Sequence, residues 1–403
     1  MARCRAVRRR EGCSSVTSAF VLTVASLLAP PTTAPPAWTL VHARTVLVTN
    51  DFGVTDASQP DNPDYDLVFT RGQAVALHAV GSARKGRWRQ FAYDGIAHDE
   101  VTDTDVNVRF VLTALGRLLR FRGPPPDTTQ PSFPIRATFY YAWYPEAWTR
   151  GSIYPYTLFH PSLDFYSADD AAVIREQVDA MRYAHLNAAI YSWWGVNGYP
   201  PTDERFWRYL AVSRATPFRW AIYYEPEGYG NPDPKQIRSD LEYIRDVYAS
   251  QPAYLKVDGR FVVYVYGGAG DSCAMADRWR EANLGIGAYI VLKAFGFDAY
   301  LHCAAKPDAW HLYSPTLPEF ALPPSAFMIS PGFDETRAAT PALSRDLGRW
   351  KQDIADMVGY AAPWQLVLTF NEWPEGSSVE SASEWQTPSG YGAYLDALHD
   401  GIP

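Results

Sequence analysis

The chain has 403 residues, 47% of them hydrophobic and 20% charged, so it can bury a large core and is not expected to be disordered. Its formal net charge of -8, from 36 basic and 44 acidic residues, argues against nucleic acid or an anionic membrane surface as the main partner. Aromatic residues make up 15% of the chain, which favours either a Trp-rich core or a sugar site walled by rings.

Residues 1–43 have the order of a secretory signal. Five arginines within the first ten residues precede the apolar run from Ala19 to Ala29, and Val41-His42-Ala43 offers a cleavage point, with an earlier cut near Ala34 as an alternative. No other segment approaches the roughly 18 to 20 apolar residues of a membrane span. The sequence therefore predicts a secreted or extracytoplasmic protein, and retention by an uncleaved N-terminal anchor is the other interpretation.

Two segments follow the signal. Residues 44–122 contain short alternating runs typical of strands and predict a small β accessory domain; the runs are Thr45–Val48, Tyr65–Phe69, Ala74–Leu77 and Val106–Leu112. Residues 123–134 are rich in proline, which favours an extended, stiff linker.

Residues 135–403 alternate between apolar runs and helical patterns. Eight runs have the character of strands buried in a parallel sheet: Ala137–Trp143, Ala188–Trp194, Phe218–Tyr224, Phe261–Tyr266, Ala288–Leu292, Trp310–Tyr313, Phe327–Ser330 and Leu366–Phe370. Helices are expected after Ser167, which with Asp170 forms a capping box, and at Asp203–Ser213, Pro234–Tyr248, Ala274–Ala282 and Leu343–Val358. This pattern predicts an α/β fold, a (β/α)8 TIM barrel behind the small β domain, with the sixth and seventh units weakest because their connections are Pro-rich. A doubly wound open sheet is the alternative, although no glycine-rich phosphate loop supports it.

Four cysteines are present, and Cys4 and Cys13 lie in the signal segment. In an exported protein, Cys273 and Cys303 favour a disulfide over a metal site, because no Cys/His spacing typical of metal binding occurs. No cofactor is predicted.

In a barrel of this kind the residues at the carboxyl ends of the strands form the site. Here those ends carry aromatic rings and carboxylates, notably Glu225 and the run Asn371-Glu372-Trp373-Pro374-Glu375. Two carboxyl groups flanking a glycosidic bond are the usual machinery of a glycosidase, one as acid and the other as base or nucleophile. Glu372 and Glu375 are the candidate pair; the plain alternative is that one of them caps a helix or pairs with an arginine such as Arg337.

The same strand ends resemble glycoside hydrolase family 99, the endo-α-mannosidase and endo-α-mannanase family, and its 71/99-like (WbsX-like) relatives. The resemblance spans about residues 136 to 400 and is carried by Phe139–Tyr144, His160–Ser167, Ser192–Gly195, Tyr224–Pro226, Ser330–Thr336 and Asn371–Gly376. It implies a retaining endo-acting hydrolase that needs no metal, with Glu372 as the base for the substrate's own 2-hydroxyl and Glu375 as the acid. It further implies that the sugar is bound by residues at the strand ends: Tyr141, Trp143, Trp193, Trp194, Tyr224, Glu225, Tyr266, Asn371 and Trp373.

Two positions depart from the family pattern. Pro374 stands where the family usually has histidine, and Phe333 stands where tyrosine is common. The loss of a hydrogen-bonding group at each place bears on mannose specificity, whereas both carboxylates needed for acid and base chemistry are retained.

The sequence therefore predicts a hydrolase of an α-linked glycan or polysaccharide, and the resemblance implies that mannose is among its sugars. Two alternatives stay open: a non-catalytic carbohydrate-binding protein with the same barrel, and a protein of surface-glycan assembly.

Overall fold

The computed structural model describes residues 126–196, 198–267, 273–296 and 299–403, together with ten short strands between residues 38 and 121. The expected signal segment lies outside the described residues except for β1 (Trp38–Val41). None of the described helices is both long and apolar enough to cross a membrane.

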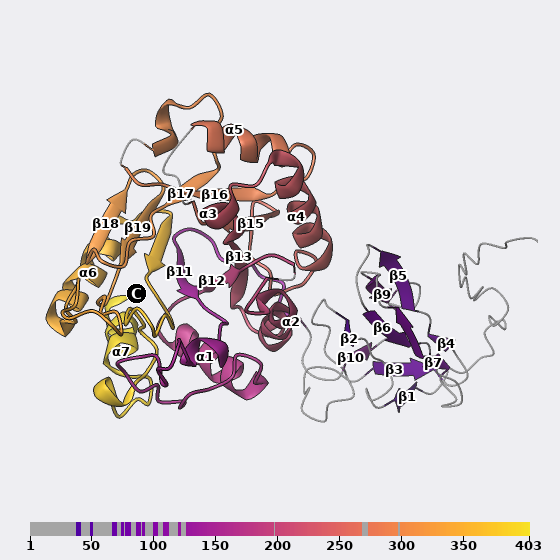
Figure 1. The fold of residues 1–403 in the computed structure, drawn as a ribbon, viewed down its shortest axis with the longest axis horizontal. Coiled ribbons are helices and arrows are strands. Elements are labelled where there is room, and N and C mark those ends of the chain that lie inside the picture. The colour runs from indigo at the N-terminus through magenta and orange to yellow at the C-terminus, as the bar shows by residue number, and fades with distance from the viewer. Residues whose placement is uncertain are drawn as a thin grey trace, which may run out of the picture.

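The strands before residue 122 pair into small antiparallel sheets (Figure 1). The sheets are β1-β3-β10, β2-β6-β8, β4-β7 and β5-β9. The remaining bounds are Thr49–Asn50 (β2), Leu67–Thr70 (β3), Ala74–Val75 (β4), Leu77–Gly81 (β5), Gly86–Arg89 (β6), Phe91–Ala92 (β7), Glu100–Asp103 (β8), Val108–Leu112 (β9) and Arg120–Phe121 (β10). Strands therefore occur at three of the four predicted runs, whereas Thr45–Val48 lies outside the described residues. The limits of an accessory domain stay a prediction.

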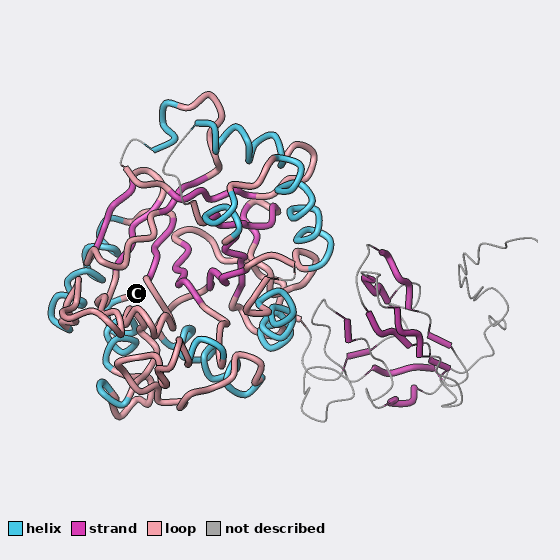
Figure 2. The backbone as a smooth tube through the Cα atoms, viewed as in Figure 1, coloured by secondary structure: helices cyan, strands magenta, loops and turns pink. Residues whose placement is uncertain are grey.

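The rest of the chain forms a barrel of parallel strands surrounded by helices (Figure 2). Its strands are β11 (Ile135–Tyr140), β12 (Ala188–Trp193), β13 (Arg219–Tyr224), β15 (Arg260–Val265), β16 (Tyr289–Lys293), β17 (Ala309–His311), β19 (Ala326–Ile329) and β20 (Trp364–Val367). Each hydrogen-bonds in parallel to its neighbour from β17 round through β11 to β20 and β19. The eight apolar runs are thus the eight barrel strands, and the TIM-barrel prediction is confirmed.

The barrel wall is closed between β17 and β19 by a side chain. The Trp310 amide donates to Ser325 Oγ at 2.7 Å, and the same hydroxyl donates to the Trp310 carbonyl at 2.5 Å. Ser325 thereby satisfies the backbone groups that a neighbouring strand would otherwise satisfy.

Helices cover the outside of the barrel. They are α1 (Ala171–Tyr183), α2 (Thr202–Ser213), α3 (Pro226–Gly230), α4 (Pro234–Val247), α5 (Cys273–Ala282), α6 (Leu347–Tyr360) and α7 (Ala393–Gly401), with 3-10 turns at Glu146–Trp148, Ala299–His302 and Ser383–Trp385. The expected capping box at Ser167 is wrong: Asp170 is the N-cap, and its carboxylate accepts the Ala172 amide at 2.7 Å. The Ser167 hydroxyl instead accepts from the Asp169 amide.

The sixth unit contains a hairpin instead of a helix. β17 is followed by β18 (Glu319–Leu322), which pairs antiparallel with β19. A second short hairpin joins β14 (Lys256–Val257) to β15. The Pro-rich connection between β17 and β19, which made the sequence prediction weakest, therefore forms a hairpin and contains no α-helix.

Aromatic rings fill the barrel interior. Phe139 packs against Tyr223 with ring centres 4.8 Å apart, and His311 lies 5.5 Å from Phe139 and 5.2 Å from Tyr264. Seven tryptophans are almost fully buried: Trp148, Trp193, Trp220, Trp279, Trp350, Trp364 and Trp373. Much of the aromatic excess therefore belongs to the core.

The described part of the linker is fastened to the barrel. The Arg219 guanidinium bonds to Asp127 and to the Thr129 carbonyl, and Gln130 bonds to Tyr254 and Lys256 at the amino end of the barrel. From residue 127 onward this segment is thus fastened along the barrel, while the limits of the linker stay a prediction.

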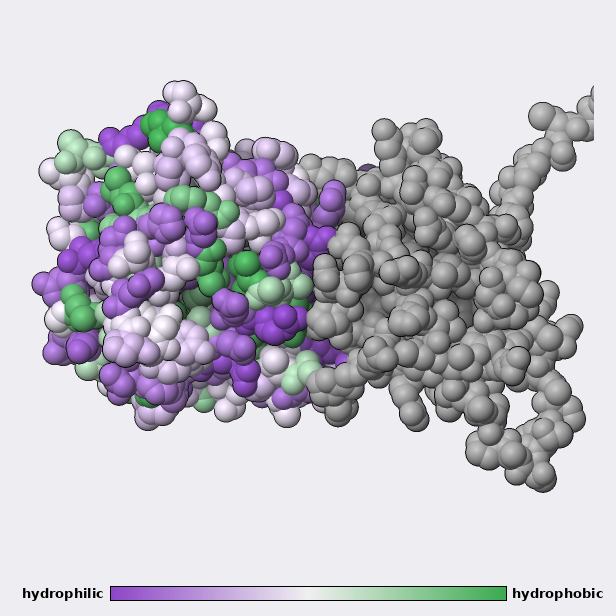
Figure 3. All heavy atoms as spheres, turned by 90° about the horizontal axis from the view of Figure 1, so that it is seen from below, coloured by the Kyte–Doolittle hydropathy of each residue, from purple (hydrophilic) through white to green (hydrophobic). Residues whose placement is uncertain are grey.

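Cys273 and Cys303 form a disulfide, as expected. It ties the start of α5 to the chain between β16 and β17. The coloured residues on the face in Figure 3 are mostly hydrophilic, with hydrophobic residues only in small groups.

Candidate active site

The carboxyl ends of the parallel strands bring the candidate residues to one mouth of the barrel. Because β11 lies between β12 and β20, the residues that follow these strands become neighbours although they are far apart in sequence. The side-chain amide of Asn371 accepts the Tyr141 backbone N–H at 2.8 Å and donates to the Tyr141 carbonyl at 2.9 Å. The first and last strands are thus fixed to each other directly beside Glu372.

Glu372 is buried at this mouth. Its backbone amide donates to Thr369 Oγ1 at 2.9 Å, and its Oε2 atom has no hydrogen-bond partner among the described residues. Burial raises the pKa of its carboxyl well above the ordinary value, and the charges of Glu375 and Glu225 add to the effect. Glu372 therefore holds a proton more firmly than an exposed carboxyl does.

Glu375 lies on the same loop and is half-buried. Burial raises its pKa to about 7 and the charge of Glu335 adds to this, whereas a hydrogen bond from Tyr313 and the charge of Lys293 oppose it. The Tyr141 hydroxyl donates to the Tyr313 hydroxyl at 2.7 Å, which leaves the Tyr313 proton for Glu375. The pKa values of both carboxyls of the pair are raised, so near neutral pH they can provide one acid and one base.

The loop that carries the pair is held by its neighbours. The Asp334 amide donates to the Glu375 carbonyl at 2.9 Å, and Thr336 bonds to Pro374. Gly376 has a φ of +59°, and a Cβ there would lie 2.5 Å from the Asp334 carbonyl oxygen, so glycine permits this close approach.

Glu225 follows β13 and is also buried. Burial raises its pKa to about 8, while a hydrogen bond from Ser192 and the charge of Lys293 act in the opposite direction. Ser192 Oγ donates to Glu225 at 2.7 Å and accepts from Trp194 Nε1 at 3.1 Å and Trp143 Nε1 at 3.3 Å. One serine thereby orients a carboxylate and two aromatic rings.

Aromatic rings line the rim next to Glu225. Trp194 stacks on Tyr229 of α3 with centres 4.8 Å apart, and Tyr229 lies 5.9 Å from Tyr266. Tyr229 is 67% exposed, so its ring is accessible at the mouth. Exposed rings of this kind suit the C–H face of a sugar.

Some residues expected to bind sugar lie elsewhere. Trp193 donates to Asp203 and Tyr224 donates to Asp240, each at 2.6 Å, and both rings are fully buried against the helices. Successive residues of a strand face opposite sides, so Ser192 points into the barrel while Trp193 points out. This placement corrects the expectation that Trp193 and Tyr224 line the site.

Trp373 and Asn371 also differ from that expectation. The Trp373 indole donates to the Tyr166 hydroxyl and to Glu380 beneath the loop, and it is fully buried. The Asn371 side chain forms its hydrogen bonds with the backbone N–H and carbonyl of Tyr141. Both residues fix the loop rather than offer a surface to substrate.

Three residues of the site were not assigned from sequence: Lys293, Tyr313 and Tyr229. Lys293 and Tyr313 come at or just after the ends of β16 and β17, so their position at strand ends was the available signal. Tyr229 lies on the short helix after Glu225, and no strand pattern indicates it.

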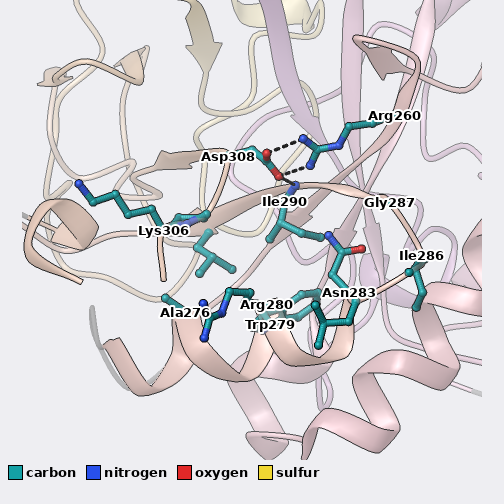
Figure 4. Close-up of a pocket in the computed structure, with 14 residues that line it drawn as sticks. Arg260, Ala276, Trp279, Arg280, Asn283, Ile286, Gly287, Ile290, Lys306 and Asp308 are labelled. Carbon is teal, nitrogen blue, oxygen red and sulfur yellow. Dashed lines mark hydrogen bonds and ion pairs between the residues drawn. The ribbon is translucent and has the colours of Figure 1, made fainter. Parts of the chain in front are cut away.

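A separate cavity of about 530 Å³ lies between α5 and the amino-terminal ends of β15 and β16 (Figure 4). Arg260 and Asp308, which form an ion pair, line it together with Asn283 and Trp279. It is at the opposite end of the strands from Glu372. Among the described residues no group of three or more His, Cys, Asp or Glu side chains could hold a metal ion.

Residues 155–298 match Glycosyl hydrolase family 99, a range that contains Glu225 and Lys293 but ends before Glu372. The glycoprotein endo-alpha-1,2-mannosidases of Rattus norvegicus and Mus musculus are each 28% identical, over 120 and 110 residues. These matches cover 27% and 25% of this chain, and the chain spans only 25% and 22% of those relatives' length.

Solved structures share the fold. The GH99 endo-alpha-mannosidase from Bacteroides thetaiotaomicron superposes with a TM-score of 0.57 at 17% identity, over 68% of this chain and 97% of that chain. A glycoside hydrolase-like protein gives a TM-score of 0.50 at 16% identity, over 70% and 97%. At such identity the likeness concerns the barrel alone.

Proposed function

From the chain's relationship to glycosyl hydrolase family 99 we propose that it is a glycoside hydrolase acting on α-linked, mannose-containing glycans. The observation that carries the proposal is the pair Glu372 and Glu375, two neighbouring carboxyls on one loop whose pKa values are both raised by burial. A pair that holds one proton between its members supplies the acid and the base that glycoside cleavage needs.

The reaction follows the route that the resemblance implies. The route requires that the one proton of the pair lies on Glu375 when substrate is bound. Ionised Glu372 then takes the proton of the substrate's 2-hydroxyl, and that oxygen forms a bond to the anomeric carbon as the glycosidic bond breaks. Glu375 gives its proton to the departing oxygen. Water then opens the 1,2-anhydro sugar, and two inversions at the anomeric carbon give net retention.

The aromatic rings at the mouth of the barrel and the Glu225 carboxylate bind the substrate. Trp143, Trp194 and Tyr266 are half-buried with faces or edges near Glu225, and we assign them together with Tyr141 to the sugar subsites. An aromatic rim open at the mouth suits an internal stretch of a glycan chain, which supports the endo mode.

We also propose that the protein acts outside the cytoplasm. The disulfide between Cys273 and Cys303 is of the kind that persists in oxidising compartments. It supports the expectation drawn from the basic and apolar N-terminal residues.

The test compares the wild-type protein with Glu372→Gln and Glu375→Gln on α-mannans, α-glucans and high-mannose glycans, with released oligosaccharides measured by mass spectrometry. Each variant is expected to lose about 10²- to 10⁴-fold in rate, because it lacks an acid or a base. Glu176→Gln, on the exposed face of α1, is the matched control and keeps full activity.

Wild-type protein that binds these glycans but releases nothing would contradict the proposal. That outcome would favour the non-catalytic carbohydrate-binding protein or a role in surface-glycan assembly. Activity that survives in both variants would remove Glu372 and Glu375 from the mechanism while leaving the hydrolase.

A further inference from the structure

Lys293 is a buried cation at the mouth of the barrel. It ends β16, and its side chain is only 5% exposed. The ammonium nitrogen lies 4.1 Å from the ring centre of Tyr266, 4.7 Å from that of Phe295 and 5.9 Å from that of Tyr313. It forms no ion pair with a carboxylate of the described residues, so aromatic rings hold it in place.

The groups that surround Lys293 are mostly acidic. Burial lowers the pKa of Lys293 to about 8, and the charges of Glu225 and Glu375 oppose that change. Among the described residues, the titratable groups at this mouth are Tyr141 after β11, Tyr223 and Glu225 at the end of β13, Tyr229 from α3, Tyr266 after β15, His311 and Tyr313 at the end of β17, Glu335 after β19, and Glu372 and Glu375 after β20. The set contains several carboxyls and one lysine, while burial keeps His311 neutral with a pKa of about 3.

This arrangement disfavours a binding site for an anionic substituent. The three buried carboxyls Glu225, Glu372 and Glu375 share one ammonium, so the mouth offers no surplus of positive charge to an anionic substituent. In a direct ion pair, the charge of Lys293 would act mainly on one carboxylate. Held by rings instead, its charge acts on Glu225 and Glu375 together.

Resting on the hydrolase function above, we propose that Lys293 is a positioning residue that keeps Glu225 and Glu375 ionisable beside Glu372 and so sets the pH range of the reaction. It acts through the carboxyls and makes no bond to the reacting atoms. Since its positive charge lowers the pKa of both carboxyls, removing it raises both pKa values.

The test is the pH profile of glycan release by Lys293→Met. The limb that depends on Glu375 as the acid is expected to move to higher pH by about one unit, the order of magnitude for a unit charge several ångströms away in a partly buried site, whereas the limb that depends on Glu372 moves less. Lys293→Arg restores the charge and is expected to return the profile toward that of the wild type. Lys306→Met, at the rim of the cavity in Figure 4 and far from Glu372, is the matched control and leaves the profile unchanged.

A second measurement does not depend on turnover. Infrared difference spectra across a pH titration follow the protonated carboxyl band, which is expected to persist to higher pH in Lys293→Met than in the wild type. Lys293→Gln serves as a second neutral variant if Lys293→Met does not fold.

The two hypotheses fail separately. A wild-type protein that releases glycans, with the same pH profile and carboxyl titration in the neutral variants, overturns the role of Lys293 and leaves the hydrolase intact. A wild-type protein without activity overturns the hydrolase, and the infrared titration alone then decides whether Lys293 controls the carboxyls.

Discussion

At the scale of single residues, the Ser192 hydroxyl serves three side chains at once. It donates to Glu225 and accepts from the indoles of Trp143 and Trp194. No other hydroxyl of the described residues is hydrogen-bonded to Glu225. The Ser192 side chain therefore orients the rings of Trp143 and Trp194 and also lowers the pKa of Glu225.

Ser192→Ala is expected to reduce kcat/KM by about tenfold or more, because each buried partner left without its hydrogen bond costs about 1–3 kcal/mol. The pKa of Glu225 rises further, since the lost hydrogen bond had lowered it. Steady-state kinetics across pH measure the loss in kcat/KM and the shift in pKa, and urea unfolding measures the free-energy cost of the lost hydrogen bonds. Ser162→Ala, an exposed serine bonded to Ser381, is the control, and equal behaviour of the two variants would refute the assignment.

At the scale of elements, α3 carries the groups next to Glu225 and lies directly on Tyr266. A Cβ at Gly228 would lie 2.3 Å from the Tyr266 ring, whereas one at Gly230 in the same helix meets nothing within 4 Å. Glu227 anchors the helix to α5 through Arg278 and the Trp279 indole. The helix therefore has no room to move toward the ring and is tied on its other side.

Gly228→Ala is expected to lower kcat/KM by about tenfold, because α3 or Tyr266 must shift and Glu225 immediately precedes this helix; steric overpacking typically costs about 1–3 kcal/mol. Gly230→Ala changes activity little. Kinetics and thermal melting of both variants provide the measurement. If Gly228→Ala behaves like Gly230→Ala, the contact does not control the site.

Elements were predictable from sequence where a continuous apolar run marked them, and for that reason all eight barrel strands were found. The direction of side chains was less accessible: Trp193 and Ser192 are adjacent, and only the strand's register in the barrel decides that the serine faces inward. Lys293 was missed because a single lysine after an apolar run is ordinarily a solvated end. Its burial under Tyr266 depends on packing between different strands.

At the scale of the whole molecule, the barrel is closed where β17 meets β19 through Ser325. Its hydroxyl takes the place of a ladder hydrogen bond to Trp310. In this unit a hairpin stands in place of a helix, and β17 and β19 are buried nonetheless. The two hydrogen bonds between Ser325 and Trp310 thus complete the ring of strands at this point.

Ser325→Ala is expected to lower the free energy of unfolding by about 1–3 kcal/mol, because the buried Trp310 amide loses its acceptor. Urea titration followed by circular dichroism measures the loss. Ser314→Ala, whose hydroxyl bonds to Thr316 at the surface, should change little. An unchanged midpoint for Ser325→Ala would mean that β17 and β19 close the barrel without this side chain.

The clamp between Asn371 and Tyr141 joins residues 230 positions apart. A ribosome adding about 5 to 20 residues per second needs roughly ten seconds to a minute to travel that far. Throughout that time Tyr141 has been made and its partner has not. The chain therefore completes its carboxylate pair only after residue 375 has been made, and a copy that stops before that residue carries no assembled site.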